Sequence, residues 1–128
     1  MRRLLAVATL ACILTSAYAQ SQVSPMSLVG RWSMSASHPS GATLITHVIL
    51  TQNLRFFGSS TADGKTFFEF AGTWSVSGNT LVWRYETSSG VFPAPGTTDT
   101  DEIVSVDATK LVLRSARSGK QNEYIRNR

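Results

Sequence analysis

Hydrophobic and polar residues alternate with a period of two along most of the chain after residue 27. Such alternation is typical of half-buried β-strands. Glycine, proline, asparagine and aspartate punctuate the pattern and mark turns. No segment there places apolar residues at helical spacing over three turns. We predict strands over eight segments, namely 28–36, 43–51, 54–61, 66–76, 80–87, 100–106, 110–115 and 121–126.

Most of the predicted connections span only two to four residues. Asp63-Gly64, within the turn 62–65, is a strong hairpin signal because both residues readily take positive φ angles. Short turns join sequential antiparallel neighbours. The pattern therefore predicts an all-β fold, an eight-stranded antiparallel up-and-down barrel, which leaves no exposed sheet edge. The alternative is a two-sheet sandwich, for which only residues 88–98 are long enough to cross over.

The alternation also assigns side chains to faces. One face of the first segment carries Leu28, Gly30, Trp32, Met34 and Ala36, and one face of the fourth carries Phe68, Phe70, Gly72, Trp74 and Val76. If the aromatic face points inward, Glu69 points to water. In the reversed register, Glu69 would be a buried carboxylate with a raised pKa and a candidate functional group.

The first residues have the pattern of an export signal. Arg2 and Arg3 precede an apolar run over 4–14, and Ala17-Tyr18-Ala19 follows as a small-x-small cleavage site. The run is too short for a membrane-spanning helix, which needs about 20 residues. We predict a signal peptide over 1–19, a polar leader over 20–26 and a barrel domain over 27–128, located in the periplasm or secreted. A competing interpretation is a lipoprotein anchored through Cys12.

Composition and charge restrict the picture further. The chain has 128 residues, 42% hydrophobic and 16% charged, which indicates one globular domain. Loss of Arg2 and Arg3 would reduce 12 basic residues to 10 against 8 acidic ones, a net charge of +2. Basic residues gather in 110–128 and acidic ones in 99–107. We interpret both as solvent-facing charges, expect no nucleic-acid partner, and expect a monomer.

Three short motifs carry a resemblance to a known family. Gly30-Arg31-Trp32 lies on the first strand, Phe70-Ala71-Gly72-Thr73-Trp74-Ser75-Val76-Ser77-Gly78-Asn79-Thr80-Leu81 spans the fourth and fifth, and Tyr124-Ile125-Arg126 lies on the last. Together they resemble the lipocalin-like (calycin) barrels of small bacterial domains, over about residues 27–126. The resemblance implies a barrel that binds a small apolar or amphipathic molecule.

The same resemblance implies how the barrel closes. In such barrels the strand-one tryptophan, here Trp32, seals one end, and an arginine of the last strand, here Arg126, packs across it. A guanidinium over an indole face contributes roughly 0.5–2 kcal/mol. Typical lipocalins also carry a helix after the barrel, for which too few residues follow the eighth strand. We therefore expect a small or filled interior.

No residue pattern indicates catalysis, a cofactor or a metal site. His38 and His47 are expected at the surface, and Asp99, Asp101 and Glu102 as exposed acids at a strand entry. Candidate ligand-binding residues are the aromatics Phe56, Phe68, Phe70, Trp74, Trp83, Tyr85 and Phe92. These aromatic residues are consistent with the lining of a pocket or of the barrel mouth, and equally with a filled core. The apolar loop 91–95 is consistent with a lid over the mouth of the barrel, and equally with a plug that folds back into its end.

These observations leave three hypotheses. The first is a small-molecule binding protein. The second is a protein-interaction module resembling the small periplasmic barrels that inhibit secreted proteases, in which residues 20–26 would enter the protease cleft. The third is an enzyme that uses Glu69 and the two histidines, His38 and His47. We predict the first, because nothing beyond those side chains favours catalysis.

Overall fold

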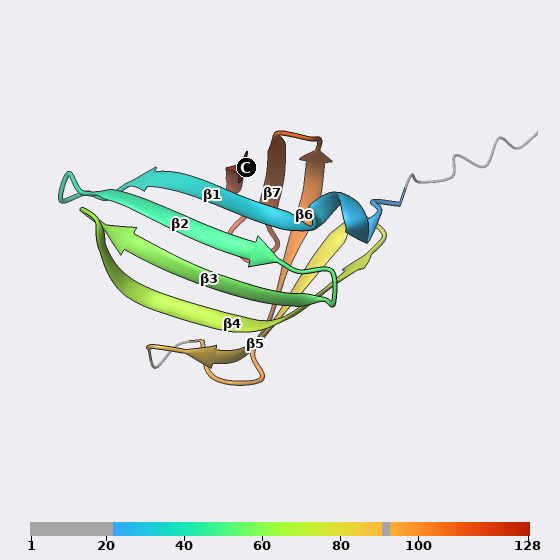
Figure 1. The fold of residues 1–128 in the computed structure, drawn as a ribbon, viewed down its shortest axis with the longest axis horizontal. Helices are drawn as coiled ribbons and strands as arrows, with labels where there is room; N and C mark the ends of the chain where they lie inside the picture. Colours follow the sequence, from blue (N-terminus) through green and yellow to red (C-terminus); the bar gives the residue numbers. More distant parts are fainter. Residues whose placement is uncertain (1–21, 91–92) are drawn as a thin grey trace, which may run out of the picture.

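The computed structural model describes residues 22–90 and 93–128 and forms a closed antiparallel barrel in which each strand pairs with the next and β8 returns to β1 (Figure 1). The elements are η1 (Pro25–Leu28), β1 (Gly30–Ser37), β2 (Thr43–Leu50), β3 (Arg55–Ala62), β4 (Lys65–Ser77), β5 (Thr80–Ser88), β6 (Thr98–Val106), β7 (Lys110–Ser115) and β8 (Gln121–Asn127). The up-and-down topology predicted from the sequence is confirmed, and the sandwich is wrong. The predicted signal peptide, Cys12 and Phe92 lie outside the described residues.

The strand boundaries agree closely with the predicted segments, with one informative exception. The first strand begins at Gly30, and Leu28 instead ends a 3-10 turn that Pro25 opens. Proline favours the first position of a helical turn because its φ is fixed there. This turn carries Leu28 inward, where its side chain is fully buried.

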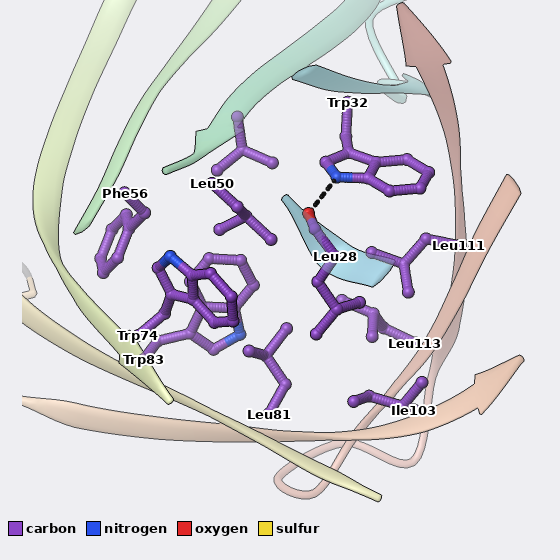
Figure 2. Packing of buried hydrophobic residues seen from close by; sticks show 11 residues of the cluster. Leu28, Trp32, Leu50, Phe56, Trp74, Leu81, Trp83, Ile103, Leu111 and Leu113 are labelled. Atoms are coloured by element: carbon purple, nitrogen blue, oxygen red, sulfur yellow. Dashed lines mark hydrogen bonds between the residues drawn. The ribbon is translucent and has the colours of Figure 1, made fainter. Parts of the chain in front are cut away.

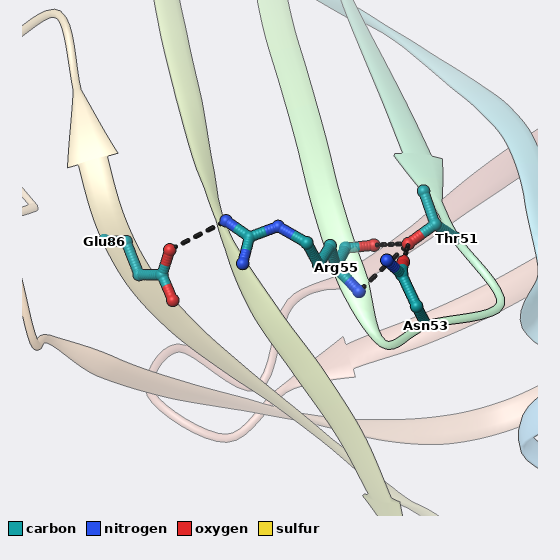
Figure 3. Close-up of polar contacts among 4 residues, drawn as sticks. All are labelled: Thr51, Asn53, Arg55 and Glu86. Carbon is teal, nitrogen blue, oxygen red and sulfur yellow. Dashed lines mark hydrogen bonds and ion pairs between the residues drawn. The ribbon is translucent and has the colours of Figure 1, made fainter.

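Turn chemistry explains two of the tight connections. Asp63 and Gly64 both take positive φ angles, 50° and 77°, as the hairpin signal predicts. Between β2 and β3, Thr51 Oγ1 accepts a hydrogen bond from the Arg55 backbone N–H at 3.0 Å (Figure 3).

An ion pair links two strands on the outer surface. In Figure 3 the side chain of Arg55 extends across β4 to Glu86 on β5, and its Nη2 lies 2.9 Å from Glu86 Oε2. Both partners are exposed, so this ion pair adds little stability.

The hydrophobic core fills one end of the barrel. Figure 2 shows apolar side chains from the 3-10 turn and from strands β1 to β7 converging there. The buried cluster comprises Leu28, Trp32, Val48, Leu50, Phe56, Trp74, Leu81, Trp83, Ile103, Leu111 and Leu113. The Phe56 ring meets the ring of Trp83 edge-on at 5.1 Å between centroids, a favoured aromatic arrangement. This end is the one at which the odd-numbered strands begin.

The acidic and basic stretches of the sequence meet in the fold. Strand β6 pairs with β7, so the exposed acid Glu102 contacts Arg114 at 3.0 Å. Likewise, Lys110 contacts Glu123 at 3.5 Å across β7 and β8. The charge asymmetry along the chain is thus partly neutralised on the outer surface.

The structure also bears on membrane spans. In residues 22–90 and 93–128 it contains no helix with the length and hydrophobicity that a membrane-spanning helix requires.

Candidate ligand site

Trp32 and Arg126 form the floor of the barrel. They are direct register partners on β1 and β8, and the guanidinium carbon of Arg126 lies 4.1 Å from the centroid of the Trp32 ring. Trp32 Nε1 donates to the Leu28 carbonyl at 2.9 Å (Figure 2). Arg126 donates to the carbonyls of Val29 at 2.7 Å and Ser27 at 2.8 Å. These contacts tie the first strand, the last strand and the 3-10 turn together.

The contact between Trp32 and Arg126 requires a glycine at residue 30, two positions before the tryptophan. Its φ is +146°, and a Cβ atom added there would lie 2.5 Å from Arg126 Nη1. Any side chain at residue 30 would therefore collide with the guanidinium or displace it. The Gly-x-Trp motif and Arg126 act as one packing unit, which seals this end against water.

The opposite end of the barrel encloses a cavity of about 270 Å³. It lies where the even-numbered strands begin, above the filled core. Its lining residues come from six strands and the β7–β8 turn: Thr46, Val48, Phe70, Trp83, Tyr85, Asp99, Asp101, Ser115, Ser118, Lys120, Asn122 and Tyr124. Four aromatic rings and several hydrogen-bonding groups therefore face the same space, a lining more polar than that of most ligand pockets.

Two carboxylates inside this cavity overturn an expectation from the sequence. Asp99 and Asp101 were expected as exposed acids, but both line the cavity and are half-buried, and only Glu102 is exposed. The physical reason is strand alternation, since Asp99, Asp101 and the buried Ile103 share one face of β6. The period-two spacing to Ile103 is the sequence signal that could have found them.

Burial changes the protonation behaviour of the cavity groups. Burial raises the pKa of Asp101, Asp99 adds to this rise, and the hydrogen bond that Trp83 Nε1 donates to Asp101 Oδ2 at 2.8 Å opposes it. Burial, and then the nearby carboxylates, raise the pKa of Tyr85 to about 12. Burial likewise raises the pKa of Tyr124 to about 12. Both phenols are therefore neutral at physiological pH and can donate or accept hydrogen bonds.

The predicted aromatic residues divide between core and cavity. Phe56 and Trp74 are buried in the filled core, at 0% and 2% exposure. Phe70, Trp83 and Tyr85 line the cavity. Phe68 is half-buried, with its ring 5.5 Å from that of Phe70. The cavity end of the barrel thus fits the prediction of a pocket, and the opposite end fits the prediction of a filled core.

A second, larger hollow of about 520 Å³ lies on the outer face of β2 to β5. It brings together His47 and Glu69, two of the three residues of the enzyme hypothesis, because His47 pairs with Ser59 and Ser59 with Glu69 across adjacent strands. Glu69 is exposed, so the reversed register that would bury it is wrong. The serine lies between the other two, whereas a Ser-His-carboxylate relay needs the histidine in the middle.

The outer hollow is also poorly suited to holding a small molecule. His47 and Glu69 are exposed, and Phe57 is 47% exposed. A ligand resting there would keep much of its surface in water, whereas typical pockets bury most of the ligand surface. His38, the other histidine, is exposed in a turn and lies 2.8 Å from Ser40 Oγ, as expected of a surface residue.

The fold and the cavity together define a class of protein. The chain is an eight-stranded closed antiparallel β-barrel, consistent with a calycin-like fold, with one end filled and the other enclosing a polar and aromatic cavity. No protein-family model matches the sequence, and no curated protein matches it either.

Proposed function

We propose that this protein is a lipocalin-like binding protein that holds one small amphipathic molecule inside the open end of its barrel. The observation that carries the proposal is the cavity itself, about 270 Å³ lined by aromatic rings and hydrogen-bonding groups. A cavity of about 150 Å³ is enough to bind benzene. The available space therefore suits a compound of a single ring with a polar substituent and is too small for a long acyl chain.

The polar lining favours an amphipathic ligand over a purely apolar one. Thr46, Ser115 and Asn122 present hydrogen-bonding groups to the cavity. The Thr46 hydroxyl pairs with Ser60 Oγ at 2.9 Å, and Ser115 Oγ accepts the backbone N–H groups of Arg117 and Ser118 at 3.2 Å. Asn122 is thus the one of the three whose side chain has no hydrogen-bond partner among the described residues, and a wholly apolar occupant would leave it without one at a cost of roughly 1–3 kcal/mol. With the signal peptide predicted over 1–19, we propose that binding takes place in the periplasm or outside the cell.

The protein-interaction hypothesis finds less support in the N-terminal leader. Val23 donates its backbone N–H to the Gly78 carbonyl at 3.2 Å and packs against the core. The 3-10 turn that follows delivers Leu28 into the floor. Much of the leader is thus part of the barrel, whereas the inhibitory mechanism requires a segment free to enter a protease cleft.

The test is native mass spectrometry of protein purified after expression of the full chain, followed by titration with single-ring compounds. Trp83 lines the cavity, so its fluorescence reports occupancy. We expect binding to be lost in Asn122→Phe, which fills the cavity, and retained in Glu123→Phe, the adjacent exposed position on β8. A protein that carries no molecule and responds to no compound, or a response equal in both variants, would overturn the proposal.

A further inference from the structure

The cavity holds a carboxylate without a cationic partner. Asp101 is half-buried and faces the interior, and its Oδ2 accepts the hydrogen bond from Trp83. Among the residues that the structure describes, no lysine, arginine or histidine lies within ion-pair distance of Asp101. Charges withdrawn from water are normally paired or neutralised. The negative charge of Asp101 therefore lacks a positive counter-charge, which a cationic ligand would supply.

The other charged groups around the cavity lie nearer the rim. Asp99 faces Arg117 at 3.7 Å, a long contact in which the arginine side chain is 62% exposed. Lys120 belongs to the exposed end of the β7–β8 connection and contributes to the lining. Tyr85 and Tyr124, whose pKa values are raised to about 12, are neutral phenols. Asp101 is thus the carboxylate that lacks a cationic neighbour.

The aromatic walls complement a positive charge. Phe70, Trp83, Tyr85 and Tyr124 surround the same space as Asp101. The negative face of an aromatic ring attracts a cation within about 6 Å of its centroid, and the attraction grows when water is excluded. A carboxylate and several rings in one small enclosure select an ammonium group attached to an apolar body.

We propose that the ligand is a small organic amine, bound as its ammonium ion to Asp101 with its apolar body against the aromatic wall. This inference rests on the proposed function and adds the chemical class of the ligand. Asp101 Oδ1, which has no hydrogen-bond partner among the described residues, and the two phenol oxygens are hydrogen-bond acceptors for the ammonium N–H groups. Lys120 disfavours the same ligand by like-charge repulsion and sets an upper limit on its affinity.

The experiment compares three probes of nearly equal size and different charge: benzylamine, benzyl alcohol and benzoate. Isothermal titration calorimetry on the protein from the full chain at neutral pH measures each affinity. We expect benzylamine to bind at least tenfold more tightly than benzyl alcohol, and benzoate most weakly. Asp101→Asn should remove this preference, whereas Glu69→Gln, which alters the acid of the outer hollow, should leave it unchanged. Lys120→Met should strengthen benzylamine binding about threefold or more.

The outcomes separate the two proposals. Equal or tighter binding of benzyl alcohol or benzoate would overturn the amine assignment and leave the binding function standing. Benzylamine binding that survives Asp101→Asn would overturn the assignment to this carboxylate. Failure of all three probes, together with an empty protein in the native mass spectrum, would overturn both. Asp99→Asn provides a second variant should Asp101→Asn not fold, and it should weaken benzylamine selectively.

The pH dependence provides an independent readout. Because the cation favours the ionised carboxylate, benzylamine affinity should fall as the pH drops through the pKa of Asp101, with protons released on binding at acidic pH. Asp101→Asn should lack this component. A benzylamine affinity that does not vary with pH down to the acid range would contradict the proposal.

Discussion

Replacing Arg126 with methionine tests the physical basis of barrel closure. The guanidinium lies over the buried Trp32 ring at 4.1 Å, and a desolvated cation–π contact of this kind contributes about 1–2 kcal/mol. Its hydrogen bonds to Val29 and Ser27 add about 1.5 kcal/mol each, since the donor is charged. Arg126 Nε is buried without a partner in the described structure, and methionine removes that penalty of about 1–2 kcal/mol.

The balance predicts a net loss of about 2–4 kcal/mol in the free energy of unfolding for Arg126→Met, a large part of the roughly 5–15 kcal/mol by which domains are stable. Urea unfolding followed by tryptophan fluorescence should show a midpoint lower by about 1–2 M. The matched control is Arg84→Met, an exposed arginine on β5. A double-mutant cycle with Trp32→Leu should give a coupling of about 1 kcal/mol or more. Equal stability of the two arginine variants, or strictly additive losses in the cycle, would refute the reasoning.

Two further predictions concern the wall and the interior. Gly72→Ala should destabilise the barrel by about 3 kcal/mol or more, measured by thermal unfolding, because the new Cβ would overlap the Arg84 backbone oxygen, which cannot move aside. Gly58→Ala should cost less, because its Cβ would meet only the outer atoms of the Phe70 ring, which can turn aside; equal losses would contradict this difference. Asp101→Asn should raise stability at pH 7, because the folded pKa of the aspartate lies above its unfolded value. That gain should shrink as the pH falls through the folded pKa, and a constant gain from pH 7 to pH 3 would argue against burial as its cause.

The sequence determined the architecture because each strand of the barrel can be recognised from the alternation of its own residues. Alternation has a fixed period of two, so the sequence placed Glu69 on the face opposite to Phe68 and Phe70, and the structure decided that Glu69 faces the solvent. The hairpin at Asp63-Gly64 depends on the conformational preferences of two adjacent residues. Short turns then leave sequential antiparallel pairing as the simplest topology. The Trp32–Arg126 pairing came from a family resemblance, and no local pattern predicted it.

Whether the barrel interior is filled or hollow could not be predicted from the sequence, because it depends on distances between side chains of different strands. Whether an enclosed volume is filled depends on the sizes of side chains contributed by several strands at the same height. At one end the buried rings and leucines fill it, while at the other Thr46, Ser115 and Asn122 leave it open. Charge misled the assignment of Asp101, because an acid is usually solvated, whereas the register of β6 turned this one inward. The chain thus specified its barrel by local alternation, and only closure of β8 onto β1 brought together the residues that enclose a cavity.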